Sequence, residues 1–113
     1  MTGRRIIYNV TVKIESEIEA EWLDWMTKHH IPDVLATNLF EKVLINRLLH
    51  DDGDGGVTFA FQYICKSLEA FNIYQKKHAA ALQNDHSERY KDRYVAFRTL
   101  MEIVDEIVPK VTN

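Results

Sequence analysis

The chain starts with a strand pattern and continues with a helix pattern. Every second position of residues 6–14 is apolar or aromatic, which predicts a strand with one buried face. Large apolar side chains then recur every three to four positions over residues 17–29, which predicts a helix. Because Pro32 cannot donate a backbone hydrogen bond, we expect the chain to bend near His30 and Ile31. A short helical piece over residues 32–37 then follows.

Two more strands and a second helix come next. Residues 40–49 are rich in apolar side chains and residues 57–65 alternate in character, so both are predicted strands. The segment Asp51–Gly56 predicts the turn of a hairpin between them. Ser67 is suited to cap one helix, whose inward stripe includes Phe71, Tyr74 and His78 and which ends in the polar run 84–89. A last strand covers about residues 94–104.

The order strand, helix, strand, strand, helix, strand is that of the ferredoxin-like α+β fold, βαββαβ. Right-handed crossovers place both helices on one face of a four-stranded antiparallel sheet and put the first and third strands in its centre. We therefore predict one domain over residues 1–113, with its core in residues 5–104 and a tail over 105–113.

The opposite face of this sheet has no helices to cover it. It carries Ile7, Ile64 and aliphatic neighbours, and so exposes more apolar surface than monomers usually tolerate. A second sheet of the same kind would bury that surface. We predict a homodimer formed through the open sheet face, which makes a dimeric α/β barrel.

Composition narrows the function classes. The net charge of −3 and the lack of a basic cluster argue against nucleic acid as a partner. No apolar stretch is long enough to span a membrane, and the first residues turn polar too early for a signal peptide, so we expect a cytoplasmic protein. The single cysteine, Cys65, excludes an internal disulfide and is expected to be a small buried hydrophobe. No metal-binding spacing occurs, and no cofactor is predicted.

His30 is the candidate catalytic residue. Imidazole titrates near neutral pH, so a histidine in a pocket can act as a general acid or base. The alternative is that His29 and His30 only interact with the carboxyl end of the first helix.

Three polar residues are candidates for ligand binding. Asn9, Gln62 and Arg98 lie on three strands that the predicted order makes neighbours, so we expect them to converge on the open face. Arg98 would bind an acidic group or an enolate, and the two amides would orient a carbonyl. The alternatives are a polar network between subunits or a pairing of Arg98 with Glu102.

Three segments carry a resemblance to a known family. They are the strand at 6–12, the stretch 21–32 with its two tryptophans and its His30-Ile31-Pro32 element, and Phe97–Met101. Together they resemble a family of short uncharacterised bacterial proteins with a domain of unknown function. More broadly, the chain is similar to the dimeric α/β-barrel superfamily of antibiotic-biosynthesis monooxygenases, polyketide cyclases, muconolactone isomerases and haem-degrading enzymes. The resemblance implies a pocket beside the sheet.

Two residues gain a role from this resemblance. A His-x-Pro element like that of His30 and Pro32 follows the first helix in proteins of the ethyl tert-butyl ether degradation type, where the histidine can face the pocket. His78 occupies the helix from which some haem-degrading relatives ligate iron, but the tryptophan near the start of that helix in those enzymes has no counterpart here. The other interpretation of His78 is a histidine at the edge of the core.

These observations leave three functional hypotheses. The leading one is a homodimeric protein that binds a small acidic or aromatic molecule, as a cofactor-independent monooxygenase, cyclase or isomerase. The second is a non-catalytic interaction or ligand-sensing module, and the third is a haem-binding protein that uses His78.

Overall fold

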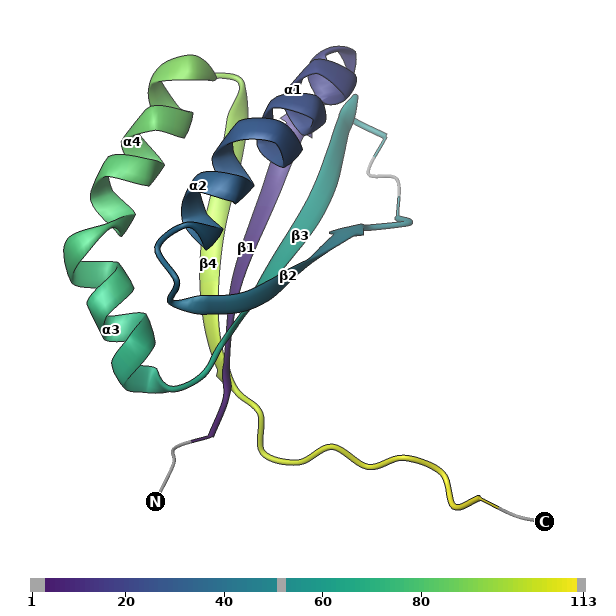
Figure 1. The fold of residues 1–113 in the computed structure, drawn as a ribbon. Coiled ribbons are helices and arrows are strands. Elements are labelled where there is room, and N and C mark those ends of the chain that lie inside the picture. The colour runs from purple at the N-terminus through teal and green to yellow at the C-terminus, as the bar shows by residue number, and fades with distance from the viewer. Residues whose placement is uncertain (1–3, 51–52, 112–113) are drawn as a thin grey trace.

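The sheet and its helices follow the predicted order. The computed structural model describes residues 4–50 and 53–111, so Asp51 and Asp52 of the predicted hairpin turn lie outside the described residues. The elements are β1 (Ile6–Glu15), a 3-10 turn (Ser16–Ile18), α1 (Glu19–Trp25), a π-helical turn (Met26–His30), α2 (Ile31–Leu35), β2 (Phe40–Arg47), β3 (Gly56–Cys65), α3 (Leu68–Lys77), α4 (Ala79–Arg89) and β4 (Tyr94–Glu102). The α+β, ferredoxin-like fold is confirmed (Figure 1).

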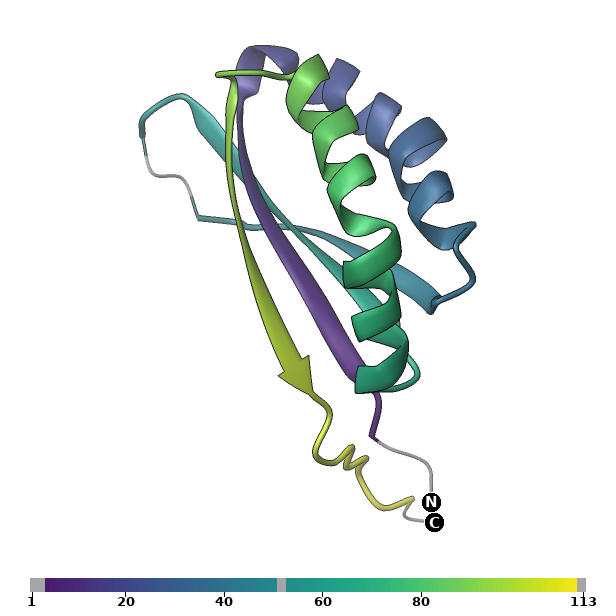
Figure 2. The ribbon, with the colours of Figure 1, turned by 90° about the vertical axis from the view of Figure 1, so that its left-hand side faces the viewer.

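The four strands form one antiparallel sheet in the order β2-β3-β1-β4. The long central pair β1 and β3 is flanked by β2 on one side and β4 on the other, as predicted. All helices lie on one face of this sheet, and the other face is open (Figure 2). Gly53 and Gly55 have φ angles of 74° and 82°, which suits the turn that leads into β3.

The core lies between the sheet and the helices. β1 and β3 direct alternate side chains toward the helices. Trp22 of α1 packs against these side chains and has no exposed surface. Its buried side chains include Tyr8, Val12, Ile14, Trp22, Phe59, Phe61 and Tyr63. Cys65 is fully buried, as expected.

Both helical segments are less regular than predicted. The first one contains a 3-10 turn and a π-helical turn in addition to α1 and α2. The second one is broken at His78, whose φ and ψ of −126° and −33° end α3 and begin α4. α4 ends at Arg89, within the polar run 84–89, as predicted.

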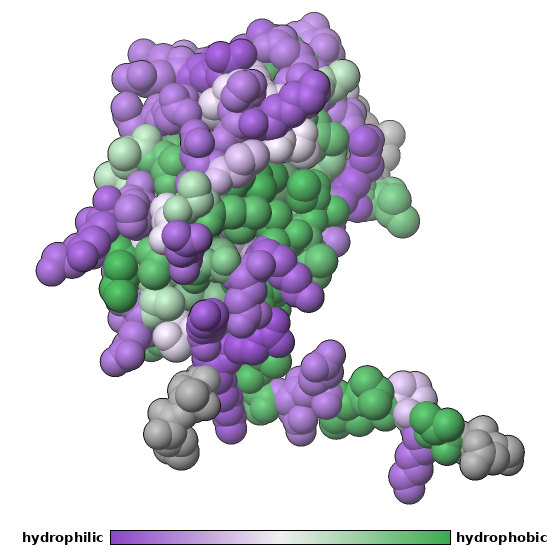
Figure 3. Space-filling view, viewed as in Figure 1, coloured by the Kyte–Doolittle hydropathy of each residue, from purple (hydrophilic) through white to green (hydrophobic). Residues whose placement is uncertain are grey.

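Apolar side chains remain exposed on the open face and along the C-terminal segment. Val95 and Phe97 of β4 are 69% and 61% exposed, and Ile107 is 86% exposed. The segment after β4 has no regular structure and extends away from the sheet, with apolar residues along its length (Figure 3). The radius of gyration of 15.9 Å exceeds the roughly 13 Å of a compact chain of this length. No helix in residues 4–50 or 53–111 is long and apolar enough to cross a membrane.

Candidate functional site

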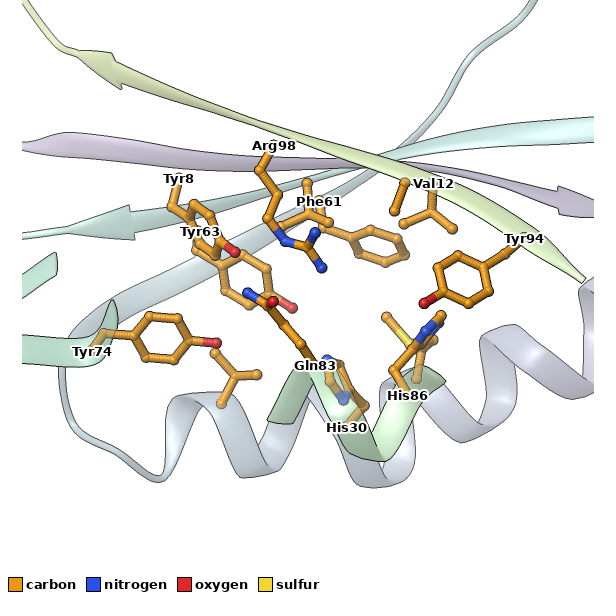
Figure 4. Close-up of a pocket in the computed structure, with 14 residues that line it drawn as sticks. Tyr8, Val12, His30, Phe61, Tyr63, Tyr74, Gln83, His86, Tyr94 and Arg98 are labelled. Carbon is orange, nitrogen blue, oxygen red and sulfur yellow. The ribbon is translucent and has the colours of Figure 1, made fainter. Parts of the chain in front are cut away.

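A cavity of about 40 Å³ lies between the helices and the sheet. It is large enough for a few water molecules. Its walls are mostly apolar and aromatic. Its polar side chains come from the sheet, the π turn, α3 and α4: Tyr8, His30, Tyr63, Tyr74, Gln83, His86, Tyr94 and Arg98. Gln83 and Arg98 point toward each other across the middle of this space (Figure 4). The side chains from the strand and the helix therefore limit the free volume.

The π turn determines where His30 lies. The backbone N–H of Ile31 donates to the carbonyl of Met26, five residues earlier, instead of four. Pro32 follows directly, and its ring would clash with the carbonyl four residues before it in a regular helix, so a wider turn relieves this contact. The extra residue in the turn stacks the His30 ring on Trp25, with centroids 5.4 Å apart and planes at 27°. His30 thereby lines the cavity.

His30 is a neutral base inside this cavity. Burial, with a smaller effect from the charge of Arg98, lowers its pKa from 6.5, while the carboxylates of Asp85 and Asp33 act in the opposite direction. Among the described residues, Nδ1 of His30 is a buried polar atom without a hydrogen-bond partner. Buried polar atoms nearly always have partners, so this nitrogen is available to a bound molecule.

His86 on α4 is the second histidine of the cavity. Its Nε2 accepts a hydrogen bond of 3.0 Å from the indole Nε1 of Trp22, which a neutral imidazole with its proton on Nδ1 can do. Burial and the nearby His30 and Arg98 lower the pKa of His86 from 6.5 to about 4. The two imidazole centroids are 5.8 Å apart. Both rings are therefore uncharged at neutral pH.

Tyrosine hydroxyls add neutral hydrogen-bond groups to the same space. Burial raises the pKa of Tyr63 and of Tyr74 far above the ordinary value, so both phenols keep their protons. The hydroxyl of Tyr94 lies 2.6 Å from Oγ of Ser87 and already has a partner.

Arg98 lies on the side of the sheet opposite to the one predicted. It pairs with Val10 across β1 and β4, whereas Asn9 pairs with Thr99, so Arg98 faces the helices and Asn9 faces away from them. The expected convergence of Arg98 with Asn9 and Gln62 is therefore wrong. The register instead brings Arg98 to the cavity that holds His30.

Arg98 is the cationic group of this cavity. Glu102, its proposed partner, pairs with Arg4 at 3.2 Å. Over residues 4–50 and 53–111, the Arg98 guanidinium takes part in no ion pair. Arg98 is exposed to solvent as well as lining the cavity, so the cavity has a charged wall next to solvent.

Asn9 and Gln62 are opposite each other on the open face of β1 and β3. Nδ2 of Asn9 donates to Oγ1 of Thr11 at 2.9 Å, and Nδ2 of Asn46 lies 3.5 Å from Oε1 of Gln62. These amides are separated from the cavity by the sheet, which agrees with the alternative of a polar network at a subunit interface.

His78 lies at the break between α3 and α4 and is not among the residues that line the cavity. It is half-buried and stacks on Tyr74, with ring centroids 6.3 Å apart. A cavity of about 40 Å³ has no room for a porphyrin, so the residues around it do not fit a haem. In the described part of the chain, no group of three or more His, Cys, Asp or Glu residues could hold a metal ion.

Sequence reasoning missed His86 and Gln83. Gln83 directly precedes the run 84–89 and His86 lies within it, and the residues of this run are polar. The signal that could have found His86 is spacing, because Leu82, His86 and Tyr90 continue the inward stripe of the helix at intervals of four.

A comparison with known protein families identifies the family of this chain. A family model described as a domain of unknown function, DUF4286, matches residues 5–104. This chain belongs to the DUF4286 family. The expected membership in a family of unknown function is confirmed. No curated protein matches this DUF4286 chain at a significant level.

Solved structures similar to this DUF4286 protein share its fold at low sequence identity. An EthD-like protein from Ralstonia eutropha has 19% identity and a TM-score of 0.65, with 93% of this chain and 96% of that chain covered. A Streptomyces coelicolor monooxygenase in complex with nanaomycin D has 13% identity and a TM-score of 0.63, with 95% and 94% covered. A dimeric ferredoxin-like protein from an uncultured marine organism has 13% identity and a TM-score of 0.60, with 92% and 99% covered. At these identities the similarity shows the fold alone.

Proposed function

We propose that this DUF4286 protein binds a small carbonyl compound in the cavity between sheet and helices and catalyses proton transfer on it without a cofactor. One observation carries the proposal: the buried Nδ1 of His30 has no partner, and His30 lines a cavity with the cationic Arg98 in its wall. A base and a positive charge in one apolar space are the two groups that enolate formation requires.

The chemistry uses only side chains of this chain. Neutral His30 takes a proton from the carbon next to the carbonyl, and the electron pair of that C–H bond forms a C=C bond. The carbonyl π electrons move to the oxygen, which becomes an enolate. Arg98 stabilises the negative oxygen, and the proton stays on the imidazolium until it returns to carbon. Proton abstraction of this kind is the first step of isomerisation and cyclisation, and of oxygenation when molecular oxygen is the co-substrate.

The electrostatics of the cavity favour this direction of transfer. The lowered pKa of His30 means that the imidazole is unprotonated at pH 7 and can accept a proton. His86, whose pKa is about 4, adds no competing positive charge. The phenol of Tyr74 keeps its proton and can donate a hydrogen bond to the substrate oxygen.

We also propose that the protein is a homodimer formed through its open sheet face. Val95 and Phe97 expose apolar surface there, at 69% and 61%, and a similar solved structure is a dimeric ferredoxin-like protein. A second copy would bury these side chains and cover the amides of Asn9 and Gln62, which lie on the same face. The cavity lies on the other side of the sheet, so it would stay accessible in such a dimer.

The test is deuterium exchange of butan-2-one, which has enolisable hydrogens and no other reactive group. In D₂O at neutral pH, the protein should accelerate exchange at the carbons next to the carbonyl, as followed by NMR. His30→Gln should abolish the acceleration, and Arg98→Gln should reduce it at least about 100-fold, in line with the loss of one oxyanion-stabilising group. His29→Gln, an exposed neighbour on the same turn, is the matched control and should keep the wild-type rate.

A rate equal to that of buffer alone would overturn the catalytic proposal. If butan-2-one then still shifted the NMR signals of the cavity residues, the non-catalytic ligand-binding module would be the correct function.

A further inference from the structure

A second hollow lies next to the cavity, between α3 and the edge strand β4. It has a volume of about 290 Å³ and is lined by Tyr8, Phe71, Gln75, Arg98, Thr99 and Leu100. Tyr8 and Arg98 also line the inner cavity. The two spaces therefore share a wall, and Arg98 lies at their junction.

The packing of the helices explains why this groove is open. Leu100 pairs with Tyr8, so both face the helices, but Leu100 is 44% exposed and Tyr8 only 4%. α3 lies above β1 and β3 in the middle of the sheet, while β4 is at its edge next to the helix (Figure 2). The helix-facing side chains of β4 are left partly uncovered.

The inner cavity is too small for more than the reacting part of a molecule. Its volume is about 40 Å³, and the side chains of Gln83 and Arg98 point into it (Figure 4). The groove offers about seven times this space, 290 Å³ against 40 Å³, with apolar walls from Phe71 and Leu100.

We infer that the groove between α3 and β4 binds the apolar body of the ligand, while its carbonyl end reaches past Arg98 to His30. This inference rests on the proposed function and names its substrate class: elongated ketones with an aryl or alkyl group a few bonds away from the carbonyl. The body is held between Phe71 and Leu100, and the guanidinium of Arg98 lies beside the carbonyl oxygen, where negative charge develops. Leu100 is then a residue that determines specificity, because it contacts the part of the ligand that does not react.

Two ketones with the same reacting end test this assignment. 4-Phenylbutan-2-one is butan-2-one with a phenyl ring on its terminal carbon. If the groove binds the ring, the catalysed exchange of the phenyl compound at low concentration should be at least about tenfold faster per molecule, the gain expected from burying part of an apolar ring. Leu100→Asn should remove this gain, so that the ratio of the two exchange rates falls toward one, because an amide replaces the apolar wall of the groove.

Leu48→Asn is the matched control, because Leu48 is also 44% exposed and follows β2 at the opposite edge of the sheet. It should keep the gain. Equal rates for the two ketones, or a gain that survives Leu100→Asn, would overturn the groove assignment while the exchange of butan-2-one still upheld the proposed function. If neither ketone exchanged, NMR shifts of the Leu100 methyl groups on adding 4-phenylbutan-2-one would support the groove, and unchanged shifts would overturn it.

Discussion

Acid sensitivity of folding should depend on His86. The imidazole has a pKa of about 4 in the folded protein and about 6.5 in the unfolded chain. Above pH 6.5 both states are neutral, and the folded state has its full stability. Between pH 6.5 and 4 the unfolded chain binds a proton that the folded protein does not, so the free energy of unfolding falls as the pH falls. Since a tenfold change in proton affinity is about 1.4 kcal/mol, lowering the pH from 7.5 to 4.5 should cost about 2 to 3 kcal/mol.

The assay is urea denaturation at pH 7.5 and 4.5 at one protein concentration, followed by tryptophan fluorescence. His86→Gln has an amide oxygen that can still accept the hydrogen bond from Trp22, but it has no proton to gain in this range. The variant should therefore lose about 2 to 3 kcal/mol less than the wild type between these pH values. His29→Gln, which changes an exposed histidine, should behave as the wild type. An identical loss in wild type and His86→Gln would refute the assignment of this effect to His86.

Three shorter predictions test the turn before His30, the open face and the thiol. Pro32→Ala should let the π turn rewind into a regular helix and so move His30 out of its buried position. The pKa of His30 measured by NMR should then rise toward 6.5, while the control Pro109→Ala should leave it unchanged. An equal pKa in both variants would contradict the role of Pro32. Phe97→Asp should weaken self-association at least about 100-fold in analytical ultracentrifugation, because a carboxylate replaces an apolar contact; unaltered sedimentation would locate the interface elsewhere. Because burial raises the pKa of the Cys65 thiol, native protein should react with a thiol reagent at least about 100-fold more slowly than unfolded protein, and comparable rates would disprove this burial.

Much of the fold could be predicted from local patterns. Every even-numbered position of β1 from Ile6 to Ile14 is apolar or aromatic, so the pattern predicts a strand and also which of its faces is buried. The hairpin glycines and the helical spacing around Trp22 give similarly direct signals. Pro32 indicated an irregularity next to the turn Met26–His30, although a π turn, which adds one residue per turn, could not be distinguished from a simple break.

The site could be predicted only in part. His30 was identified because its chemistry and its position before a proline are both local features. Arg98 lines the cavity with His30 but was assigned to the wrong face of the sheet. Both faces of β4 contain apolar side chains: Val95 and Phe97 on one, Tyr94 and Ala96 on the other. A strand without a clear alternation carries no information about which face is buried.

The sequence by itself determined the order of the elements, the class of fold and the uncovered sheet face, because each follows from periods of two or 3.6 residues within one segment. Only the tertiary structure decided which residues share the cavity. The pairing of Arg98 with Val10 directs it toward the helices, and the course of α4 beyond His78 brings His86 to Trp22. Register and helix path depend on contacts between residues distant in the chain, and these contacts leave no periodic signal in any single segment.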